Sequence, residues 1–421
     1  MTDSPVWHPF TQHGLGQPVI EIASAEGASL TTRAGGKLID AISSWWVITH
    51  GHRHPAIMAA IQRQADQLDQ VIFAGFTHEP AEQLAIELIA LSPPGLEHVF
   101  YSDSGSTAVE VALKMALGFW RNTGTPRTTI VAMEHAYHGD TVGAMSVGAR
   151  GVFTAAYEPL LFDVARIPFP HAGREQATLD AFEAACRNQP PAALIVEPLI
   201  LGAGGMLIYS PAVLSALHRI CRAHGTLFIT DEVLTGWGRT GTLFACEQAG
   251  ITPDILCIAK GLTGGALPLA ATLCTAEIFG AHVAPDRARM FFHSSSYTAN
   301  PIACAAALAN VRVWQNEPVL ERVRSLAARQ TVALARFKGD SRVSNLRQCG
   351  TIAALDLGGS ADGYLATAAP KLAAFFIEHG VLLRPLGNTI YVLPPYCITG
   401  EELTRVYDAI SAALDHKGDF A

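Results

Sequence analysis

The chain has 421 residues, 49% of them hydrophobic and only 16% charged, which predicts two or three domains, a well-filled core and a large buried subunit interface. Its net charge of −8 argues against a nucleic-acid or anionic-membrane surface, and no apolar run is long enough to cross a membrane. Eight cysteines without a CxxC pair, and a start without a basic-then-apolar signal, lead us to expect reduced thiols in a cytoplasmic protein.

The first 40 residues predict an irregular segment and a small hairpin that turns at Gly35-Gly36. Two adjacent tryptophans, Trp45 and Trp46, follow in the stretch AISSWWVITHGHRHP. Most tryptophans pack in a core or an interface, and the alternative is an aromatic wall over a substrate. The histidines at positions 50, 52 and 54 do not indicate a metal site, because the glycine and proline around them predict a turn and no carboxylate has ligand spacing.

Helices are expected over residues 56–70 and within 73–91, and a third begins in SDSGSTAVEVALKMALGFW. Its apolar residues fall on one face, at positions 108, 111, 112, 115, 116, 119 and 120, and we expect Glu110 and Lys114 to form an ion pair on the other. Ser104 to Thr107, including Gly105 and Ser106, read as the helix cap. A capped N-terminus opened by glycine can bind phosphate, although an ordinary cap explains these residues equally well.

The next strand leads into AYHGD, which places Tyr137 on a loop, where it could stack on a flat cofactor or lie on the surface as an ordinary aromatic residue. A further buried strand, AALIV, ends at Glu197-Pro198 and is followed by a glycine-rich loop.

Two more buried strands end in chemically active residues. The run LFIT ends at Asp231, and ILCIA ends at Lys260, at a spacing that suits a strand, a crossover and a neighbouring strand. Ligands of open α/β sheets bind beyond the carboxyl ends of strands, so both side chains can face one site. Partial burial would lower the pKa of Lys260 and leave a neutral amine that can form a Schiff base with an aldehyde.

A surface lysine, or a simple ion pair between Asp231 and Lys260, would also fit these positions. The alternative is a pyridoxal phosphate (PLP) site, in which Lys260 carries the aldehyde and Asp231 keeps the pyridine nitrogen protonated. Val233 would then point the same way as Asp231 and pack on the ring.

Apolar strands and helices alternate from about residue 56 to 310, which predicts an α/β fold with a largely parallel sheet. From about residue 316 the pattern changes to helix, strands in TIAALDL and VLLRPLGNTIYVLPPY, and a last amphipathic helix near Glu401, as in an α+β domain.

Together these motifs resemble the class III aminotransferases of PLP fold type I, over essentially the whole chain. The residues that carry the resemblance are WHPFT, SSWW, SDSGSTAVEVALKMAL, AYHGDTVGAMS, VEPLILGAGGM, DEVLTGWGRTG, ILCIAKGLTGG, NPIACAAA and LLRPLGNTIYVLPPY. The resemblance implies a mostly parallel central sheet flanked by helices in a large PLP-binding domain, residues 45–315. A smaller α+β domain would combine residues 1–44 with residues 316–421.

The resemblance also implies roles for individual residues. Lys260, Asp231 and Tyr137 would be catalytic, with Tyr137 covering the cofactor ring. Cofactor binding would involve these three residues together with Gly105, Ser106, Val233 and, from the partner subunit of a homodimer, Ser296. Substrate binding would fall to Phe10, Trp45, Trp46, Arg384 and Tyr391, with Arg384 reading a carboxylate.

The blocks SSWW and R-P-x-G-x-x-I-Y-x-x-P-P-Y separate the chain from ornithine, acetylornithine and ω-amino acid relatives. They imply transamination of 8-amino-7-oxononanoate to 7,8-diaminononanoate in biotin biosynthesis, with S-adenosylmethionine as amino donor and lysine as the alternative donor. Other possibilities are a diamine or ω-amino acid aminotransferase using pyruvate or 2-oxoglutarate, and an aminomutase or a PLP-binding regulator. The chain departs from the family in having Phe10 for a tyrosine and three serines, 294–296, for Gly-Pro-Thr.

Overall fold

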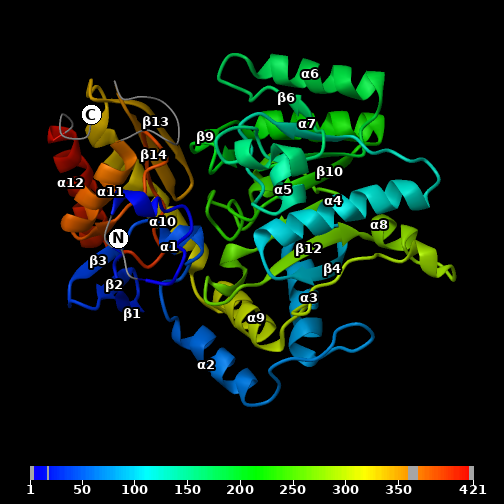
Figure 1. The fold of residues 1–421 in the computed structure, drawn as a ribbon, viewed down its shortest axis with the longest axis horizontal. Coiled ribbons are helices and arrows are strands. Elements are labelled where there is room, and N and C mark those ends of the chain that lie inside the picture. Colours follow the sequence, from blue (N-terminus) through cyan, green and yellow to red (C-terminus); the bar gives the residue numbers. More distant parts are fainter. Residues whose placement is uncertain (1–3, 17–18, 359–367, 417–421) are drawn as a thin grey trace.

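The computed structural model describes residues 4–16, 19–358 and 368–416. A seven-stranded sheet organises the larger part of the molecule, in the order β4-β12-β11-β10-β7-β5-β6 (Figure 1). Its strands are β4 (Leu96–Ser102), β5 (Ile130–Met133), β6 (Ala165–Ile167), β7 (Ala193–Val196), β10 (Leu227–Asp231), β11 (Ile255–Ile258) and β12 (Ala270–Thr275). Only β12 runs antiparallel to its neighbours. The predicted α/β fold with a mostly parallel sheet is confirmed.

Helices cover both faces of this sheet, which explains why β5, β7, β10 and β11 are buried at every residue and, apart from Thr230 and Asp231 at the end of β10, apolar throughout. One face packs against α4 (Gly105–Asn122), α5 (Val142–Val147) and α8 (Ala276–Ala281). The other packs against α3 (Glu79–Leu91), α6 (Glu175–Asn188), α7 (Pro211–His224) and α9 (Pro301–Asn316). Outside these layers, α2 (Pro55–Ala65) packs on α9.

The smaller part of the molecule draws strands from both ends of the chain (Figure 1). In one sheet, β1 (Ile22–Glu26), β2 (Ser29–Thr32) and β3 (Lys37–Asp40) form a meander, and β15 (Val381–Leu382) pairs in parallel with β3. A second sheet contains β13 (Val343–Cys349), β14 (Ile352–Leu357) and β16 (Thr389–Val392). Helices α10 (Val319–Leu334), α11 (Ala368–Glu378) and α12 (Gly400–Asp415) complete this core. The domain limits at residues 44 and 315 stay a prediction.

The remaining elements are short. A two-stranded ribbon joins β8 (Ile200–Leu201) to β9 (Leu207–Ile208), and the turn α1 (Ser43–Trp46) leads from the small sheet toward the large one. Single 3₁₀ turns are η1 (His13–Leu15), η2 (Ala155–Leu160), η3 (Ala245–Ala249), η4 (Lys260–Thr263), η5 (Arg287–Arg289) and η6 (Ala335–Phe337). Within the described ranges, no helix is both long and apolar enough to span a bilayer. All eight cysteines are free thiols.

Two sequence predictions about helices were wrong. The helix expected over residues 56–70 ends at Ala65. Glu110 and Lys114 do not pair, because each has a tertiary partner. The Glu110 carboxylate accepts the amides of Gly143 and Ala144 at 2.7 and 3.1 Å, at the start of α5, where backbone N–H groups lack helical acceptors. Lys114 Nζ donates to the carbonyl of Phe292 at 2.6 Å.

Candidate active site

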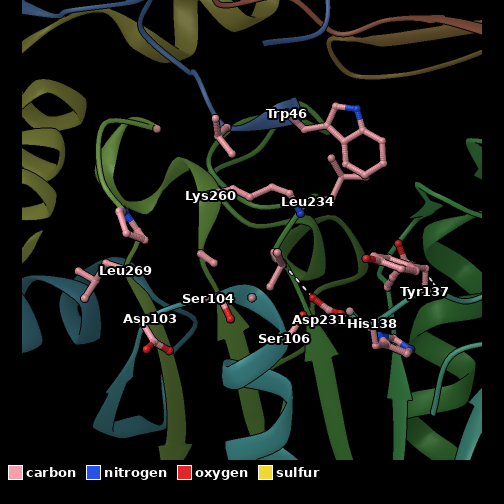
Figure 2. A pocket seen from close by; sticks show the side chains of 18 of the residues that line it. Trp46, Asp103, Ser104, Ser106, Tyr137, His138, Asp231, Leu234, Lys260 and Leu269 are labelled. Carbon is pink, nitrogen blue, oxygen red and sulfur yellow. Dashed lines mark hydrogen bonds and ion pairs between the residues drawn. The ribbon is translucent and has the colours of Figure 1, made fainter. Parts of the chain in front are cut away.

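A cavity of about 370 Å³ opens beyond the carboxyl ends of the central strands (Figure 2). It is lined by seven of the site residues that the sequence predicted, namely Trp46, Gly105, Ser106, Tyr137, Asp231, Val233 and Lys260. They come from five separate segments of the chain, and the parallel strands bring them together because their ends meet at one edge of the sheet.

The N-terminus of α4 forms one wall of the cavity. Ser104 caps the helix with a reciprocal pair of hydrogen bonds to Thr107, as expected, which leaves the amides of the first turn facing the cavity. Gly105 packs so closely on the neighbouring loop that a Cβ there would lie 2.6 Å from Val233 Cγ1. The Ser106 hydroxyl accepts the amide of Asp140 at 3.2 Å. This wall offers N–H groups and a positive dipole end to an anion.

Asp231 ends β10 and is almost fully buried. Its Oδ2 lies 2.7 Å from Nδ1 of His138, and its Oδ1 accepts the amide of Val233 at 3.1 Å (Figure 2). Nε2 of His138 is buried and makes no hydrogen bond to any described residue. The sequence placed His138 on this loop but gave it no role, because only the folded β5–α5 connection brings it to Asp231.

Lys260 follows β11, the parallel neighbour of β10, and begins η4 with a left-handed φ of 44°. A non-glycine residue in this region is strained and needs support from its surroundings. Burial lowers the pKa of the Lys260 ammonium, while the carboxylates of Asp231 and Glu197 partly oppose that shift. The amine is therefore shifted toward its neutral, nucleophilic form. Its Nζ lies 5.4 Å from the centre of the Trp46 ring.

Glu197 is a cavity residue to which the sequence analysis gave no role. Its two carboxylate oxygens accept the amides of Tyr137 and Gly202, at 2.9 and 3.0 Å. Burial raises the pKa of Glu197 to about 7, although nearby His138 and the two amides act in the other direction. A carboxylate directly after a buried strand was the available signal, and it is the same signal that identified Asp231.

Four other predicted substrate residues lie around the cavity but do not line it. The rings of Phe10 and Trp45 are 5.7 Å apart, and both are partly exposed. Arg384 places its guanidinium 5.2 Å from the centre of the Trp45 ring and donates to the carbonyl of Phe10 at 2.9 Å. Tyr391 is buried behind the wall, where its hydroxyl accepts the indole N–H of Trp46 at 3.0 Å.

Ser296 is exposed and does not line the cavity of its own chain. Its carbonyl accepts a hydrogen bond from Gln70 at 2.7 Å, and the neighbouring Ser295 hydroxyl donates to Asp103 at 3.0 Å.

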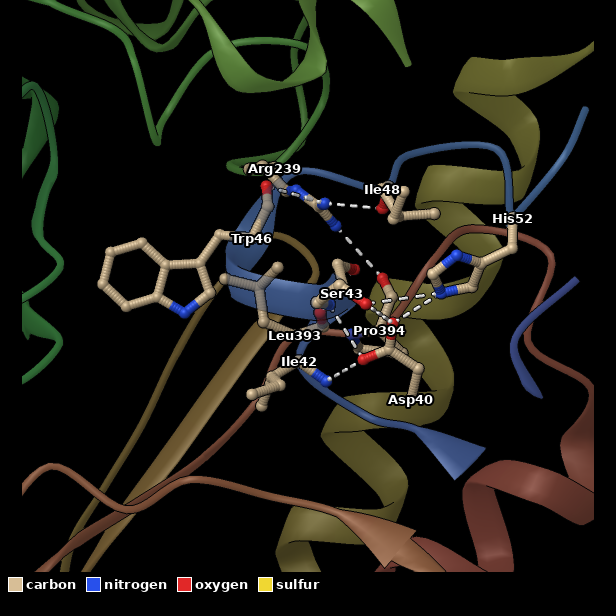
Figure 3. A network of polar contacts seen from close by, with 10 residues as sticks. Asp40, Ile42, Ser43, Trp46, Ile48, His52, Arg239, Leu393 and Pro394 are labelled. Atoms are coloured by element: carbon tan, nitrogen blue, oxygen red, sulfur yellow. Dashed lines mark hydrogen bonds and ion pairs between the residues drawn. The ribbon is translucent and has the colours of Figure 1, made fainter. Parts of the chain in front are cut away.

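Arg239, within the motif GWGRTG, is another residue whose position the sequence did not reveal. Its guanidinium is buried and donates to three backbone carbonyls, those of Trp46, Ile48 and Pro394, at 2.8–3.2 Å (Figure 3). Burial lowers the pKa of Arg239. The one sign in the sequence was a charged residue in a glycine-rich loop. The sequence could not show its partners, because the three carbonyls lie far from Arg239 along the chain.

A family model described as "Aminotransferase class-III" matches residues 10–414. The chain belongs to the class III aminotransferases. It is therefore a PLP-dependent aminotransferase of fold type I, and the resemblance seen in the motifs is confirmed.

Several similar proteins have one name, adenosylmethionine-8-amino-7-oxononanoate aminotransferase. The Synechococcus elongatus protein is 46% identical over 97% of this chain and 98% of its own length. The Mycobacterium leprae protein is 39% identical over 96% of this chain and 94% of its own length. The solved structure of the Methanocaldococcus jannaschii enzyme of this name matches with a TM-score of 0.93 and 34% identity over 97% of both chains. The structure of an amine transaminase from an uncultivated Pseudomonas species, solved with PLP bound, matches with a TM-score of 0.93 and 31% identity, over 98% of this chain and 99% of that one.

The cavity of this aminotransferase fits PLP in its chemistry. The amides of α4 suit the phosphate, and the close contact between Gly105 and Val233 leaves no room for a side chain at this wall. At the other end, the Asp231 carboxylate is fixed by His138 and suits a protonated ring nitrogen. The depressed pKa of Lys260 suits an amine that must react with an aldehyde.

Proposed function

We propose that this aminotransferase converts 8-amino-7-oxononanoate to 7,8-diaminononanoate, a step of biotin biosynthesis, with S-adenosylmethionine as amino donor. The names of its full-length relatives support this substrate pair. The observation that carries the proposal is the setting of Arg384: its guanidinium lies over Trp45 near the cavity and has no ion pair with a carboxylate in the described part of the chain. A long apolar acceptor with one distant carboxylate would supply that partner.

In this function, the first turn of α4 with Gly105 and Ser106 would hold the cofactor phosphate, and Tyr137 and Val233 would contact the ring. When bound, PLP supplies an aldehyde that accepts the amino group and a ring that withdraws electrons. Asp231 would keep the ring nitrogen protonated, and His138 holds Asp231 in place. The neutral Lys260 amine would take a proton from the donor carbon that bears the amino group. In the second half-reaction, the Lys260 ammonium would deliver a proton to the acceptor carbon that receives the amino group.

Phe10 bears on the choice of donor. It keeps the aromatic ring of the family tyrosine and lacks the hydroxyl, whose hydrogen bond is worth about 0.5–1.5 kcal/mol. That loss is too small to exclude S-adenosylmethionine, because aromatic faces at Phe10, Trp45 and Tyr137 can still stabilise its sulfonium cation.

The donor test is a half-reaction. The PLP-loaded enzyme is mixed in turn with S-adenosylmethionine, lysine and alanine, and the absorbance of the cofactor is followed. Conversion to the pyridoxamine phosphate form by S-adenosylmethionine is expected. If lysine converts the cofactor and S-adenosylmethionine does not, the donor assignment is wrong.

The acceptor test starts from the pyridoxamine phosphate form. We expect 8-amino-7-oxononanoate to restore the PLP spectrum much faster than pyruvate or 2-oxoglutarate. A preference for either small acceptor would favour the alternative, a diamine or ω-amino acid aminotransferase.

We also propose a cytoplasmic homodimer whose two sites share residues, with Ser296 serving the partner's site. In support, Ser296 is exposed and does not line its own cavity, and the same segment carries Met290, Phe292 and Tyr297, which are 44%, 61% and 63% exposed. Large exposed apolar side chains of this kind are typical of an interface.

A further inference from the structure

The turn that carries the two tryptophans has an unusual backbone. Ser43, Ser44, Trp45 and Trp46 all have positive φ angles, of 53°, 53°, 96° and 72°, and none of them is glycine. Side chains of L-residues crowd their own carbonyl groups in this region, so a run of four persists only where surrounding groups hold it.

One side of the turn is held by the fully buried carboxylate of Asp40 (Figure 3). Its Oδ1 accepts the amides of Ser44, at 2.9 Å, and of Ile42, at 3.4 Å. Its Oδ2 accepts the Ser44 hydroxyl at 2.8 Å and lies 2.8 Å from Nε2 of His52. In the described part of the chain, the groups that bond to this carboxylate belong to the turn, to Ile42 directly before it and to His52 shortly after it.

The other side of the turn is attached to the rest of the molecule. The Ser43 hydroxyl donates to the carbonyl of Leu393 at 2.8 Å, and Arg239 binds the carbonyls of Trp46 and Ile48 (Figure 3). The turn is thus fixed between Asp40 at the end of β3 on one side and, on the other, Leu393, which follows β16, and Arg239.

The turn sends its two indoles to different places. The Trp46 ring is buried, lines the cavity and has its centre 5.4 Å from Lys260 Nζ, whereas Trp45 is 40% exposed and lies next to Phe10 and Arg384. Because side-chain direction follows the backbone dihedrals, relaxation of the turn would move both rings together.

We infer that Asp40 is a positioning residue for acceptor recognition: by holding this left-handed turn, it sets the cavity wall at Trp46 and the aromatic surface at Trp45 beneath Arg384. His52 assists by holding the Asp40 carboxylate. Asp40 does not line the cavity, so it acts only through the turn. The inference rests on the proposed function for the identity of the acceptor.

The first test is Asp40→Asn, which keeps the shape and removes the charge. We expect the KM of the acceptor to rise about tenfold while kcat changes little, because acceptor binding and not chemistry is disturbed. The matched control is Asp356→Asn, since Asp356 is also a carboxylate with several donors, from Arg347, Thr389 and Asn345, but does not touch the turn. The control should leave this KM unchanged.

A second readout needs no substrate. Acrylamide quenching of tryptophan fluorescence should increase in Asp40→Asn, because Trp46 loses its buried position, and the increase should vanish when Asp40→Asn is made in a Trp46→Phe background. Unchanged quenching and KM in Asp40→Asn would overturn the inference, as would equal changes in Asp356→Asn.

A pair of variants at Ser44 covers the case in which Asp40→Asn does not fold. Ser44→Ala and Ser44→Gly lose the same hydroxyl, but only glycine adopts a φ of 53° without strain. If the left-handed turn positions the indoles, Ser44→Ala should raise the acceptor KM and the quenching several-fold more than Ser44→Gly. Equal effects would contradict the inference.

These experiments also separate the two proposals. If the wild-type enzyme does not use 8-amino-7-oxononanoate, the proposed function fails, while the quenching comparison between Asp40→Asn, its control and the Ser44 pair still tests the role of the turn.

Discussion

At the scale of single residues, Arg384 is the group on which the proposed acceptor recognition depends. Arg384→Ala should cost on the order of 2–4 kcal/mol in transition-state binding of the acceptor, because it removes a charge-assisted bond to a carboxylate. The measurement is kcat/KM for the acceptor half-reaction in single turnover. An acceptor analogue without the carboxylate is the control, and its rate should hardly change. A loss confined to the donor half-reaction would show that the assignment is wrong.

Glu197 leads to a prediction about pH. Its pKa is raised from 4.5 to about 7, so between these values the folded protein holds a proton that the unfolded chain has released. The stabilisation from this group is complete below about pH 4.5 and is lost as pH rises through 7, a change of about 2–4 kcal/mol in the free energy of unfolding.

The test compares wild type with Glu197→Gln, whose side chain does not titrate. As pH rises from 5 to 8, the free energy of unfolding of the wild type should fall relative to that of Glu197→Gln. Parallel pH profiles for the two proteins would contradict the assigned pKa.

Among the residues at the ends of buried strands, the sequence identified Lys260 and Asp231 but not Glu197. Lys260 and Asp231 each follow an apolar run, so their meeting at one sheet edge could be predicted. Arg239 and Asp40 could not be recognised in this way. Arg239 binds backbone carbonyls, and Asp40 accepts two backbone amides besides its contacts with the side chains of Ser44 and His52. Backbone partners leave no trace in residue type.

At the scale of elements, the N-terminus of α4 is fitted closely to the loop after β10. A methyl group at residue 105 would meet Val233 Cγ1 at 2.6 Å, so Gly105→Ala should displace the first turn of the helix and weaken PLP binding by about tenfold or more. Equilibrium dialysis or quenching of protein fluorescence by PLP would measure the affinity.

The double variant Gly105→Ala with Val233→Ala is the control for this prediction. It removes the methyl group that the new Cβ would strike, so it should recover part of the affinity relative to Gly105→Ala. If Gly105→Ala binds PLP as tightly as wild type, the fit between helix and loop has no bearing on the cofactor.

The direction of a strand in the sheet was harder to predict from the sequence than whether a segment forms a strand or a helix. Apolar runs and caps predicted the strands and helices of the large sheet well, including the Ser104 cap. The antiparallel direction of β12 was not predictable, because an apolar run reads the same in both directions and only pairing with β11 and β4 decides it. The Glu110–Lys114 prediction failed for a related reason: helical spacing permits the pair, but amides of α5 were the better partner.

At the scale of the whole molecule, the proposed sharing of sites between subunits leads to a prediction about mixed dimers. Lys260→Ala and Ser296→Asp should each be inactive, the second because its charge would repel the cofactor phosphate. If Ser296 serves the partner's site, a heterodimer of the two variants has one intact site. Mixing and re-associating the two variants should therefore restore roughly a quarter of wild-type activity.

The control is each variant re-associated with itself, which should stay inactive. Light scattering on the same samples would establish the dimer. An active monomer, or a mixture that recovers nothing although heterodimers form, would contradict the shared site.

The pairing of β3 with β15 has a consequence for how the protein is made. Ile39 pairs with Val381 in this sheet, so β3 is synthesised early but cannot form this pairing until β15, near the end of the chain, has been synthesised. At ordinary synthesis rates of ~5–20 residues per second, the wait is roughly 20–70 s. During that time the meander β1-β2-β3 has an unpaired edge, whereas the central sheet, whose strands end at Thr275, can already assemble on the ribosome. Newly made chains should therefore depend on chaperones at their N-terminal end, and a circular permutant that begins after β12 would synthesise β15 before β3 and shorten the exposure.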